Sequence, residues 1–152
     1  KFALKKVKNK ISKFANKKKF KIINLLKEKK FFKENNQKFD YIICLSVINN
    51  FKDKQTVIEY LKSFYNLLKK NGKLIIDSNL YDNHNYKLIN KKKNLFTTNQ
   101  KNNYQLNMFF PKKNEFINMV KSSGFKINDI GTSNFKVFDT FENEIILSVT
   151  KK

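Results

Sequence analysis

The single histidine, His84, stands in a polar stretch whose residue types could carry acid–base chemistry. Tyr81, Asp82 and Tyr86 lie near it in the sequence, and an imidazole among such groups can serve as a general base toward an oxygen or nitrogen nucleophile. A lone loop histidine is also often only a surface residue, so both interpretations stay open. One histidine and one cysteine do not make a metal-binding set, and the sequence therefore predicts no metal site.

A second group of polar residues, Ser46 and Asn49, comes directly after the apolar run 39–45. In an open parallel sheet, ligands bind beyond the carboxyl ends of the strands, so this turn is a candidate binding site. Asn49 has another interpretation, in which it belongs to a polar turn and either Asn50 or Asp53 caps the helix that follows.

A strand–helix–strand unit is expected to position this turn. The run 39–45 is short and rich in aromatic and β-branched residues, which is typical of a strand buried on both faces. Apolar residues then recur at three- and four-residue steps from Val57 to Leu68, which predicts a helix with its left-handed exit at Asn71-Gly72. A second apolar run, 73–78, predicts a strand parallel to the first.

The segments before and after this unit are less regular. Apolar residues at helical spacing predict a helix over 2–15, FKIINL predicts a strand over 20–25, and Phe31-Phe32 indicates a helical turn. Residues 79–111 are polar, rich in Asn and poorly periodic, so a long loop is expected there.

The C-terminal part predicts one helix and two strands. The helix over 114–123 has Asn114 as its expected cap and Gly124 at its end. Strands are expected over 125–130 and 144–150, with the residues between them forming a connection.

The composition bounds the class of protein. The 152 residues are 40% hydrophobic, enough for one folded domain, and no apolar run reaches the roughly 18 residues needed to span a bilayer. The net charge of +21 invites a nucleic-acid partner, but the 33 basic residues are all Lys and are spread along the chain, so nucleic acid is not favoured. The lone Cys44 fits a small core residue, and the sequence shows no signal peptide, so a cytoplasmic location is expected.

The order of these motifs resembles the class I S-adenosylmethionine-dependent methyltransferases. The likeness rests on the strand FDYIICL, the turn SVINNF, the helix end LLKKNG and the strand KLIIDS, followed by FINMVKSSGFKI. The resemblance implies an α/β fold, a three-layer Rossmann-like sandwich with a C-terminal antiparallel hairpin. The family's Gly-rich cofactor loop is missing, since Gly72, Gly124 and Gly131 do not form it. The resemblance therefore implies a fold that is N-terminally incomplete and lacks its first strands.

The resemblance also implies a site. It makes residues 1–152 a single methyltransferase-like domain, with 79–111 as an insertion on the substrate side, and S-adenosyl-L-methionine as the cofactor. The implied cofactor contacts are Asn24, Cys44, Leu45, Ser46 and Asn49. The implied substrate contacts are Asn79, Tyr81 and His84. Asn24 departs from the family's usual Asp, and a plain strand end is an equally open interpretation of it.

Methyl transfer to a small-molecule or sugar-like acceptor is the function that this resemblance favours. Such enzymes work largely by aligning the acceptor with an already activated methyl group, which agrees with the lack of a catalytic constellation in the sequence. Three alternatives stay open: an RNA methyltransferase, a basic RNA-binding or interaction module, and an inactive truncated remnant.

Overall fold

The computed structural model describes residues 29–81, 86–91, 94–98, 107–137 and 140–152. The chain divides into two compact units, Lys1–Glu34 and Asn35–Lys152. The described part of the first unit is the short helix α2 (Lys29–Glu34), in which the rings of Phe31 and Phe32 meet edge to face. The predicted helical turn at these two residues is thus confirmed. The helix predicted over 2–15 and the strand predicted over 20–25 lie outside the described residues.

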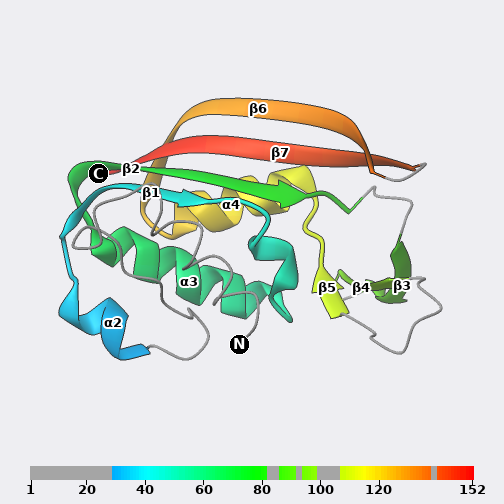
Figure 1. The fold of residues 1–152 in the computed structure, drawn as a ribbon, viewed down its shortest axis with the longest axis horizontal. Coiled ribbons are helices and arrows are strands. Elements are labelled where there is room, and N and C mark those ends of the chain that lie inside the picture. Colours follow the sequence, from blue (N-terminus) through cyan, green and yellow to red (C-terminus); the bar gives the residue numbers. More distant parts are fainter. Residues whose placement is uncertain (1–28, 82–85, 92–93, 99–106, 138–139) are drawn as a thin grey trace, which may run out of the picture. The chain divides into compact units, whose positions relative to one another are not determined.

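The second unit is built on a mixed four-stranded sheet (Figure 1). Its strands are β1 (Phe39–Cys44), β2 (Leu68–Asn79), β6 (Phe125–Val137) and β7 (Thr140–Lys151). The order is β1-β2-β7-β6, with β1 and β2 parallel and β7 antiparallel to both of its neighbours. Both the predicted parallel pair and the predicted C-terminal antiparallel hairpin are confirmed.

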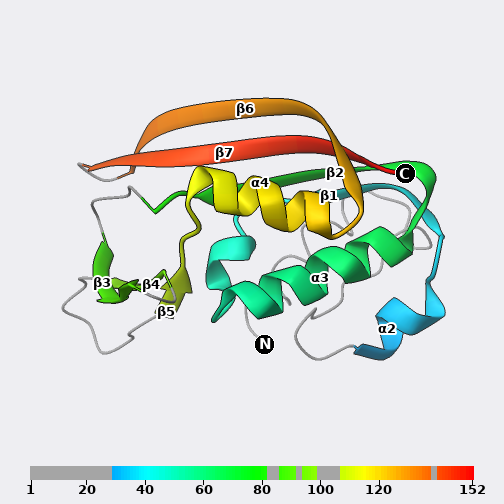
Figure 2. The same ribbon diagram turned by 180° about the vertical axis from the view of Figure 1, so that it is seen from behind.

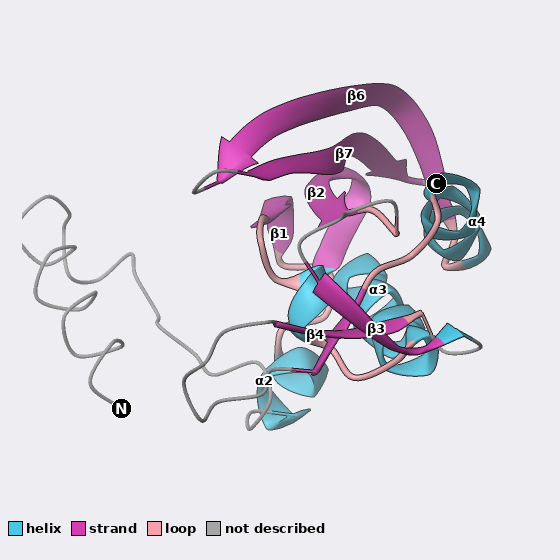
Figure 3. Ribbon diagram, turned by 90° about the vertical axis from the view of Figure 1, so that its right-hand side faces the viewer, coloured by secondary structure: helices cyan, strands magenta, loops and turns pink. Residues whose placement is uncertain are grey.

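Two helices, α3 (Lys54–Leu67) and α4 (Lys113–Ser122), lie on the same face of this sheet (Figures 1 and 2). Figure 3, which looks along the strands, shows α3 below β1 and β2 and α4 to the right of the sheet. The core between them is formed by apolar side chains that are almost fully buried. They include Val57, Leu61, Phe64, Leu74, Ile76, Phe116, Val120, Leu147 and Val149. Alternate residues of β2 and β7 point into this layer, as the period of a strand requires.

The opposite face of β1 is open, which corrects a prediction. Tyr41 is 66% exposed and Ile43 is 67% exposed, so this strand is not buried on both faces. The two long helices α3 and α4 pack against the face of the sheet that carries Cys44 and Ile76, so they do not bury the opposite face of β1. No helix among the described residues has both the length and the apolar character of a membrane span.

The start of each long helix is fixed by a carboxylate. Asp53 precedes α3 in extended backbone and its Oδ1 accepts from the Thr56 N–H at 2.8 Å, so Asp53 is the cap. Ahead of α4, the cap position is Lys112, whose N–H donates to Glu115 at 3.4 Å. The predicted cap at Asn114 is therefore wrong, because Asn114 already lies within the first turn. Gly124, with φ of +101°, ends α4 as predicted.

The junction of α3 and β2 differs from the prediction by a few residues. The helix ends at Leu67, and Leu68 adopts extended backbone that buries its side chain. The left-handed residue is Asn71, with φ of +62°, so the expected conformation occurs after the helix has ended. At Gly72 an added Cβ would lie 2.9 Å from the Lys69 carbonyl oxygen, so glycine is required by close approach.

Residues 79–111, expected to form a loop, contain a second sheet. Its strands are β3 (Tyr86–Asn90), β4 (Leu95–Thr98) and β5 (Asn107–Phe109), all antiparallel in the order β3-β4-β5. A loop was expected because the segment lacks a regular pattern of apolar residues. Strands can pair through their backbone hydrogen bonds without such a pattern, so the expectation was wrong. One backbone hydrogen bond, from Tyr81 N–H to Pro111 O at 2.9 Å, joins the two ends of this insertion, and another, from Phe110 N–H to Asn94 O at 3.0 Å, lies within it.

Most of the segment 131–143, which was predicted to be a connection, belongs to strands. Strand β6 continues to Val137, and β7 already begins at Thr140. This part of β6 was missed because it carries exposed polar residues such as Thr132 and Asn134. An edge strand with polar side chains has none of the alternation that marks a half-buried strand.

Candidate functional site

The carboxyl ends of β1 and β2 form the edge at which a parallel pair presents a ligand site. Cys44, the last residue of β1, lies opposite Ile76 of β2. The chain then turns through Leu45 and Ser46 into the short 3₁₀ helix η2 (Ile48–Asn50). Leu45 is 47% exposed and Ser46 is also exposed, so the turn presents both an apolar and a hydroxyl side chain to the outside.

Ser46 has a left-handed backbone, with φ of +55°, a conformation that is unfavourable for a residue with a side chain. Asp77, the residue after Ile76 in β2, holds it there. The Ser46 N–H donates to Asp77 Oδ1 at 2.7 Å, and the Asp77 residue is only 4% exposed. On the other side of the turn, the Asn50 amide donates to the Ser46 carbonyl oxygen at 3.0 Å. The peptide groups around Ser46 are therefore held from both sides.

A second carboxyl group lies beside Asp77. Burial and the neighbouring Glu144 carboxyl raise the pKa of Asp77 to about 6, although the Ser46 N–H acts in the opposite direction. Glu144 belongs to β7 and accepts a hydrogen bond from the Ser133 hydroxyl at 3.0 Å. Asp77 was not among the residues singled out from the sequence. The signal that could have found it is an acidic residue at the end of the otherwise apolar run LII.

Asn49 lies beneath the turn and is 5% exposed. Its Nδ2 donates to Phe109 O at 2.9 Å, to Asn79 O at 3.1 Å and to Ser78 Oγ at 3.2 Å. Its Oδ1 accepts from the Asn79 N–H at 2.8 Å. Every hydrogen-bonding group of the amide is thus engaged within the protein, and the side chain joins η2 to the end of β2 and to β5.

Cys44 lies below the same edge, buried on the helix side of the sheet. Burial, with a smaller contribution from the charge of Asp77, raises the pKa of its thiol to about 12. The thiol is therefore protonated at neutral pH and behaves as a small core residue, as the sequence indicated.

The structure brings together five of the residues predicted to form the site. Leu45, Ser46 and Asn49 share one turn with Cys44 at its start, and Asn79 is bonded to Asn49. Tyr81 follows two residues later and lies under the ammonium of Lys112, 5.5 Å from Nζ to the ring centroid. Asn24 and His84 lie outside the described residues. Within the described ranges, no cluster of three or more potential metal ligands occurs.

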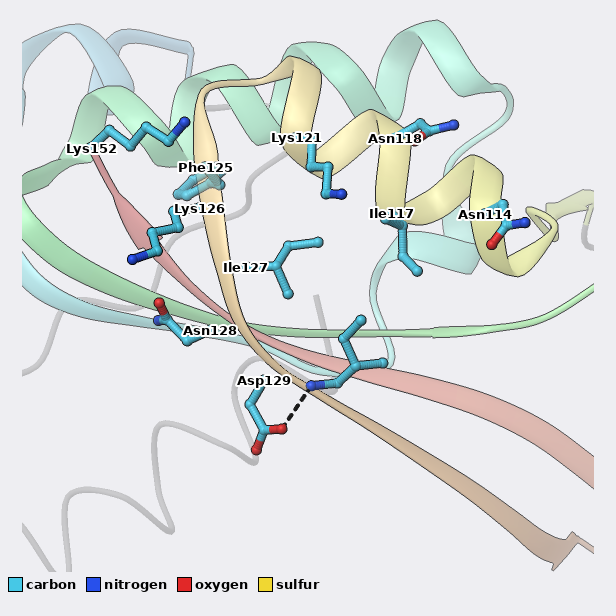
Figure 4. A pocket seen from close by; sticks show the side chains of 11 residues that line it. Asn114, Ile117, Asn118, Lys121, Phe125, Lys126, Ile127, Asn128, Asp129 and Lys152 are labelled. Atoms are coloured by element: carbon cyan, nitrogen blue, oxygen red, sulfur yellow. Dashed lines mark hydrogen bonds between the residues drawn. The ribbon is translucent and has the colours of Figure 1, made fainter.

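An open groove of about 1050 Å³ lies elsewhere, between α4 and the first half of β6 (Figure 4). Ile117 and Lys121 line it from the helix, and Lys126 and Ile127 line it from the strand. Lys126 pairs with Thr150, which pairs with Lys73. The groove therefore extends toward the amino-terminal part of β2, whereas Asp77 and Ser46 mark the carboxyl end.

A family model described as a methyltransferase domain matches residues 7–129 of this chain. No protein of curated function matches the chain significantly in sequence.

Solved structures with the same fold agree with the family match. An S-adenosylmethionine-dependent methyltransferase from Methanosarcina mazei has a TM-score of 0.67 at 12% identity, covering 77% of this chain and 61% of its own. A second structure is the 1,6-didemethyltoxoflavin-N1-methyltransferase of Burkholderia thailandensis, with 1,6-didemethyltoxoflavin and S-adenosylhomocysteine bound. Its TM-score is 0.54 at 13% sequence identity, and the match covers 77% of this chain and 45% of that structure. A Thermotoga maritima protein described as a possible histamine N-methyltransferase has a TM-score of 0.53 at 19% sequence identity, and the match covers 78% of this chain and 58% of that structure. The chain spans less than two thirds of each of these structures.

The α/β fold inferred from the motifs is confirmed by these structures. The resemblance to class I methyltransferases is likewise confirmed, and with it S-adenosylmethionine as the cofactor of the family. Because the family model matches most of the chain, from the N-terminal segment through the first half of β6, the assignment does not depend on any single motif. The chain belongs to the methyltransferase domain family.

Proposed function

We propose that the protein transfers a methyl group from S-adenosylmethionine to a small-molecule acceptor, and that the turn after β1 forms one wall of the cofactor site. The observation that carries this proposal is the exposed Leu45-Ser46 turn at the shared carboxyl edge of the parallel strands β1 and β2. A ligand at this edge would meet apolar surface from Leu45 and a hydroxyl from Ser46.

The described residues fit part of such a cofactor. An adenosine-like group has a flat apolar face and hydroxyls, and these match an exposed leucine beside an exposed serine. Cys44 and Asn49 would contribute through position and backbone, because the Cys44 thiol is buried and protonated and the Asn49 amide is fully bonded. S-adenosylmethionine, when bound, supplies a methyl group that its sulfonium has already activated. The protein's task is then to hold donor and acceptor in line and to exclude water.

The substrate side is proposed to involve Asn79, Tyr81 and His84, with His84 as the candidate base. The backbone of Asn79 is fixed by Asn49, and Tyr81 is fixed by the Pro111 carbonyl, so both have defined positions at the start of the insertion. Small acceptors are favoured because two of the similar structures, a 1,6-didemethyltoxoflavin-N1-methyltransferase and a protein described as a possible histamine N-methyltransferase, are named for small molecules. A sugar-like acceptor belongs to the same proposal. A cytoplasmic location is also part of this proposal.

Titration calorimetry with S-adenosylhomocysteine tests the cofactor part. We expect saturable binding that Leu45→Glu weakens by at least about tenfold, because a carboxylate would replace the apolar contact. Ile130→Glu is the matched control, since Ile130 is similarly exposed but lies on β6. Equal losses in both variants, or no binding by the unaltered protein, would contradict the proposal.

The rival hypothesis of a basic RNA-binding module predicts a different pattern. RNA would bind without the cofactor, and its affinity would fall steeply with salt because lysines would contact phosphates. Single-stranded RNA should therefore be titrated at two salt concentrations in parallel with S-adenosylhomocysteine. RNA binding that persists at moderate salt, combined with no response to the cofactor product, would favour the rival.

A further inference from the structure

We infer that Asp77 is a positioning residue for the cofactor: its carboxylate holds the Ser46 peptide in the left-handed conformation that shapes the cofactor-facing turn. This inference rests on the proposed function, since it assigns a role to a residue that supports the wall formed by Leu45 and Ser46.

The first support is the geometry of the hydrogen bond. Asp77 Oδ1 accepts from the Ser46 N–H at 2.7 Å across 31 residues of sequence, and a bond to an ionised acceptor is stronger than a neutral one. The second support is the backbone itself. A serine with φ of +55° is held against its intrinsic preference, so something must stabilise it. Among the described residues, Asp77 is the group that binds the amide of this peptide, and its burial keeps water from replacing it.

The third support is the set of titratable groups around Asp77. Glu144 faces it from β7, and Cys44 faces it from β1, so the described neighbours add negative charge and one protonated thiol. Protonation of Asp77 relieves the repulsion from Glu144 but removes the charge that strengthens the bond to Ser46. The turn is consequently held more firmly when Asp77 is ionised. Cofactor affinity should therefore fall as the pH is lowered through about 6.

Two measurements on the unaltered chain and on Asp77→Asn test this inference. In the first, the Ser46 amide resonance is followed by NMR between pH 4.5 and 8, with no cofactor present. We expect it to shift with a midpoint near 6 in the unaltered protein and to stay constant in Asp77→Asn. An asparagine can still accept from Ser46 through its Oδ1, so this variant keeps the fold but lacks the titration.

In the second measurement, the dissociation constant of S-adenosylhomocysteine is determined over the same pH range. The dissociation constant should rise about tenfold from pH 7.5 to pH 5 in the unaltered protein, because a charge-assisted hydrogen bond contributes a free energy of about that factor. In Asp77→Asn it should stay constant over this range. Asp40→Asn is the control, because Asp40 is an exposed β1 carboxylate that pairs with Lys69 at 2.9 Å. Its pH profile should match that of the unaltered protein.

A rescue experiment separates positioning from general damage. Asp77→Ala should weaken binding by about tenfold or more in the unaltered chain but by less in a chain that already carries Ser46→Gly, because glycine adopts positive φ without strain. The comparison within the Ser46→Gly chain cancels the loss of the serine hydroxyl. An equal loss in both chains, or a pH dependence of affinity that survives in Asp77→Asn, would overturn the inference. If the unaltered protein binds no S-adenosylhomocysteine at any pH, the proposed function and this role both fail. Normal binding with a Ser46 amide that does not titrate overturns the role of Asp77 alone.

Discussion

The side chain of Asn49 acts as a strand partner for the backbone of Asn79. Its Oδ1 accepts from the Asn79 N–H at 2.8 Å and its Nδ2 donates to the Asn79 carbonyl at 3.1 Å. One amide side chain thus occupies both backbone groups of the last residue of β2, as a neighbouring strand would. A third bond, to Phe109 O at 2.9 Å, joins the insertion to the same point.

Replacing Asn49 by Ala should destabilise the protein by about 2–4 kcal/mol. The substitution removes the hydrogen bonds that the Asn49 amide makes with the Asn79 backbone and with the carbonyl of the buried Phe109, and the loss of hydrogen bonds at a buried site is costly. Urea denaturation at pH 7 measures the change. Asn50→Ala is the matched control, because the Asn50 side chain is exposed and donates a single hydrogen bond to the described residues, to Ser46 O, so about 0.5 kcal/mol is expected. Similar losses in the two variants would show that Asn49 is not the joint described above.

Cys44 should resist alkylation in the native protein. Its thiol is buried and its raised pKa, about 12, leaves almost no thiolate at pH 8. We expect iodoacetamide to modify the chain only after urea is added, as intact mass would show. Modification at the same rate with and without urea would mean that this end of the sheet opens readily.

The stability of the protein should carry a pH dependence that comes from Asp77. Its pKa is raised from 3.8 in an unperturbed chain to about 6 in the folded state, so the folded state binds the proton more tightly. The resulting stabilisation is complete below pH 3.8 and is lost as the pH rises through about 6. Relative to Asp77→Asn, the free energy of unfolding of the unaltered protein should therefore fall by about 2 kcal/mol between pH 4 and pH 7.

Urea denaturation at pH 4, 5.5 and 7 on both proteins measures this difference. The comparison removes the effect of the other charges, which the two chains share. A difference that is constant with pH, or that grows in favour of the unaltered protein as the pH rises, would contradict the folded-state environment described for Asp77.

Two glycines should respond oppositely to alanine. At Gly72 a Cβ would lie 2.9 Å from Lys69 O and 3.0 Å from the Leu68 side chain, so Gly72→Ala should cost about 1–3 kcal/mol. At Gly131 the nearest atoms, both of Ile146, lie 3.9 Å away, and Gly131→Ala should be neutral or stabilise by up to about 1 kcal/mol. Thermal melts of the two variants check the pair, and a larger loss at Gly131 would refute the packing described at the start of β2.

The parts of the fold that sequence reasoning predicted are those whose signal is local. The spacing from Val57 to Leu68 predicted α3, and the apolar runs on either side predicted β1 and the buried part of β2. Gly124 predicted the end of α4 because a glycine that can adopt positive φ is a signal that needs no distant partner. Each of these signals lies within about fifteen residues of chain.

The parts that were missed depend on distant partners. Thr132 and Asn134 belong to β6 because β7 pairs with them, and this polar segment lacks the apolar alternation that marks a half-buried strand. The structural role of Asn49 depends on Asn79 and Phe109, which are 30 and 60 residues away. Asp77 was overlooked for the same reason, since its partners Ser46 and Glu144 come from two other segments. The turn at Leu45 and Ser46 was found because the end of a strand can be located from the strand alone.

The sheet order β1-β2-β7-β6 also bears on how the protein is made. Strand β7 lies between β2 and β6, although it is synthesised after both. Before β7 is made, none of the described strands is a neighbour for β6 in the central sheet, and β1 is the described strand that pairs with β2. Folding of this unit during translation must therefore wait until Thr140–Lys151 has left the exit tunnel, and β6 is the segment that a chaperone would shield until then.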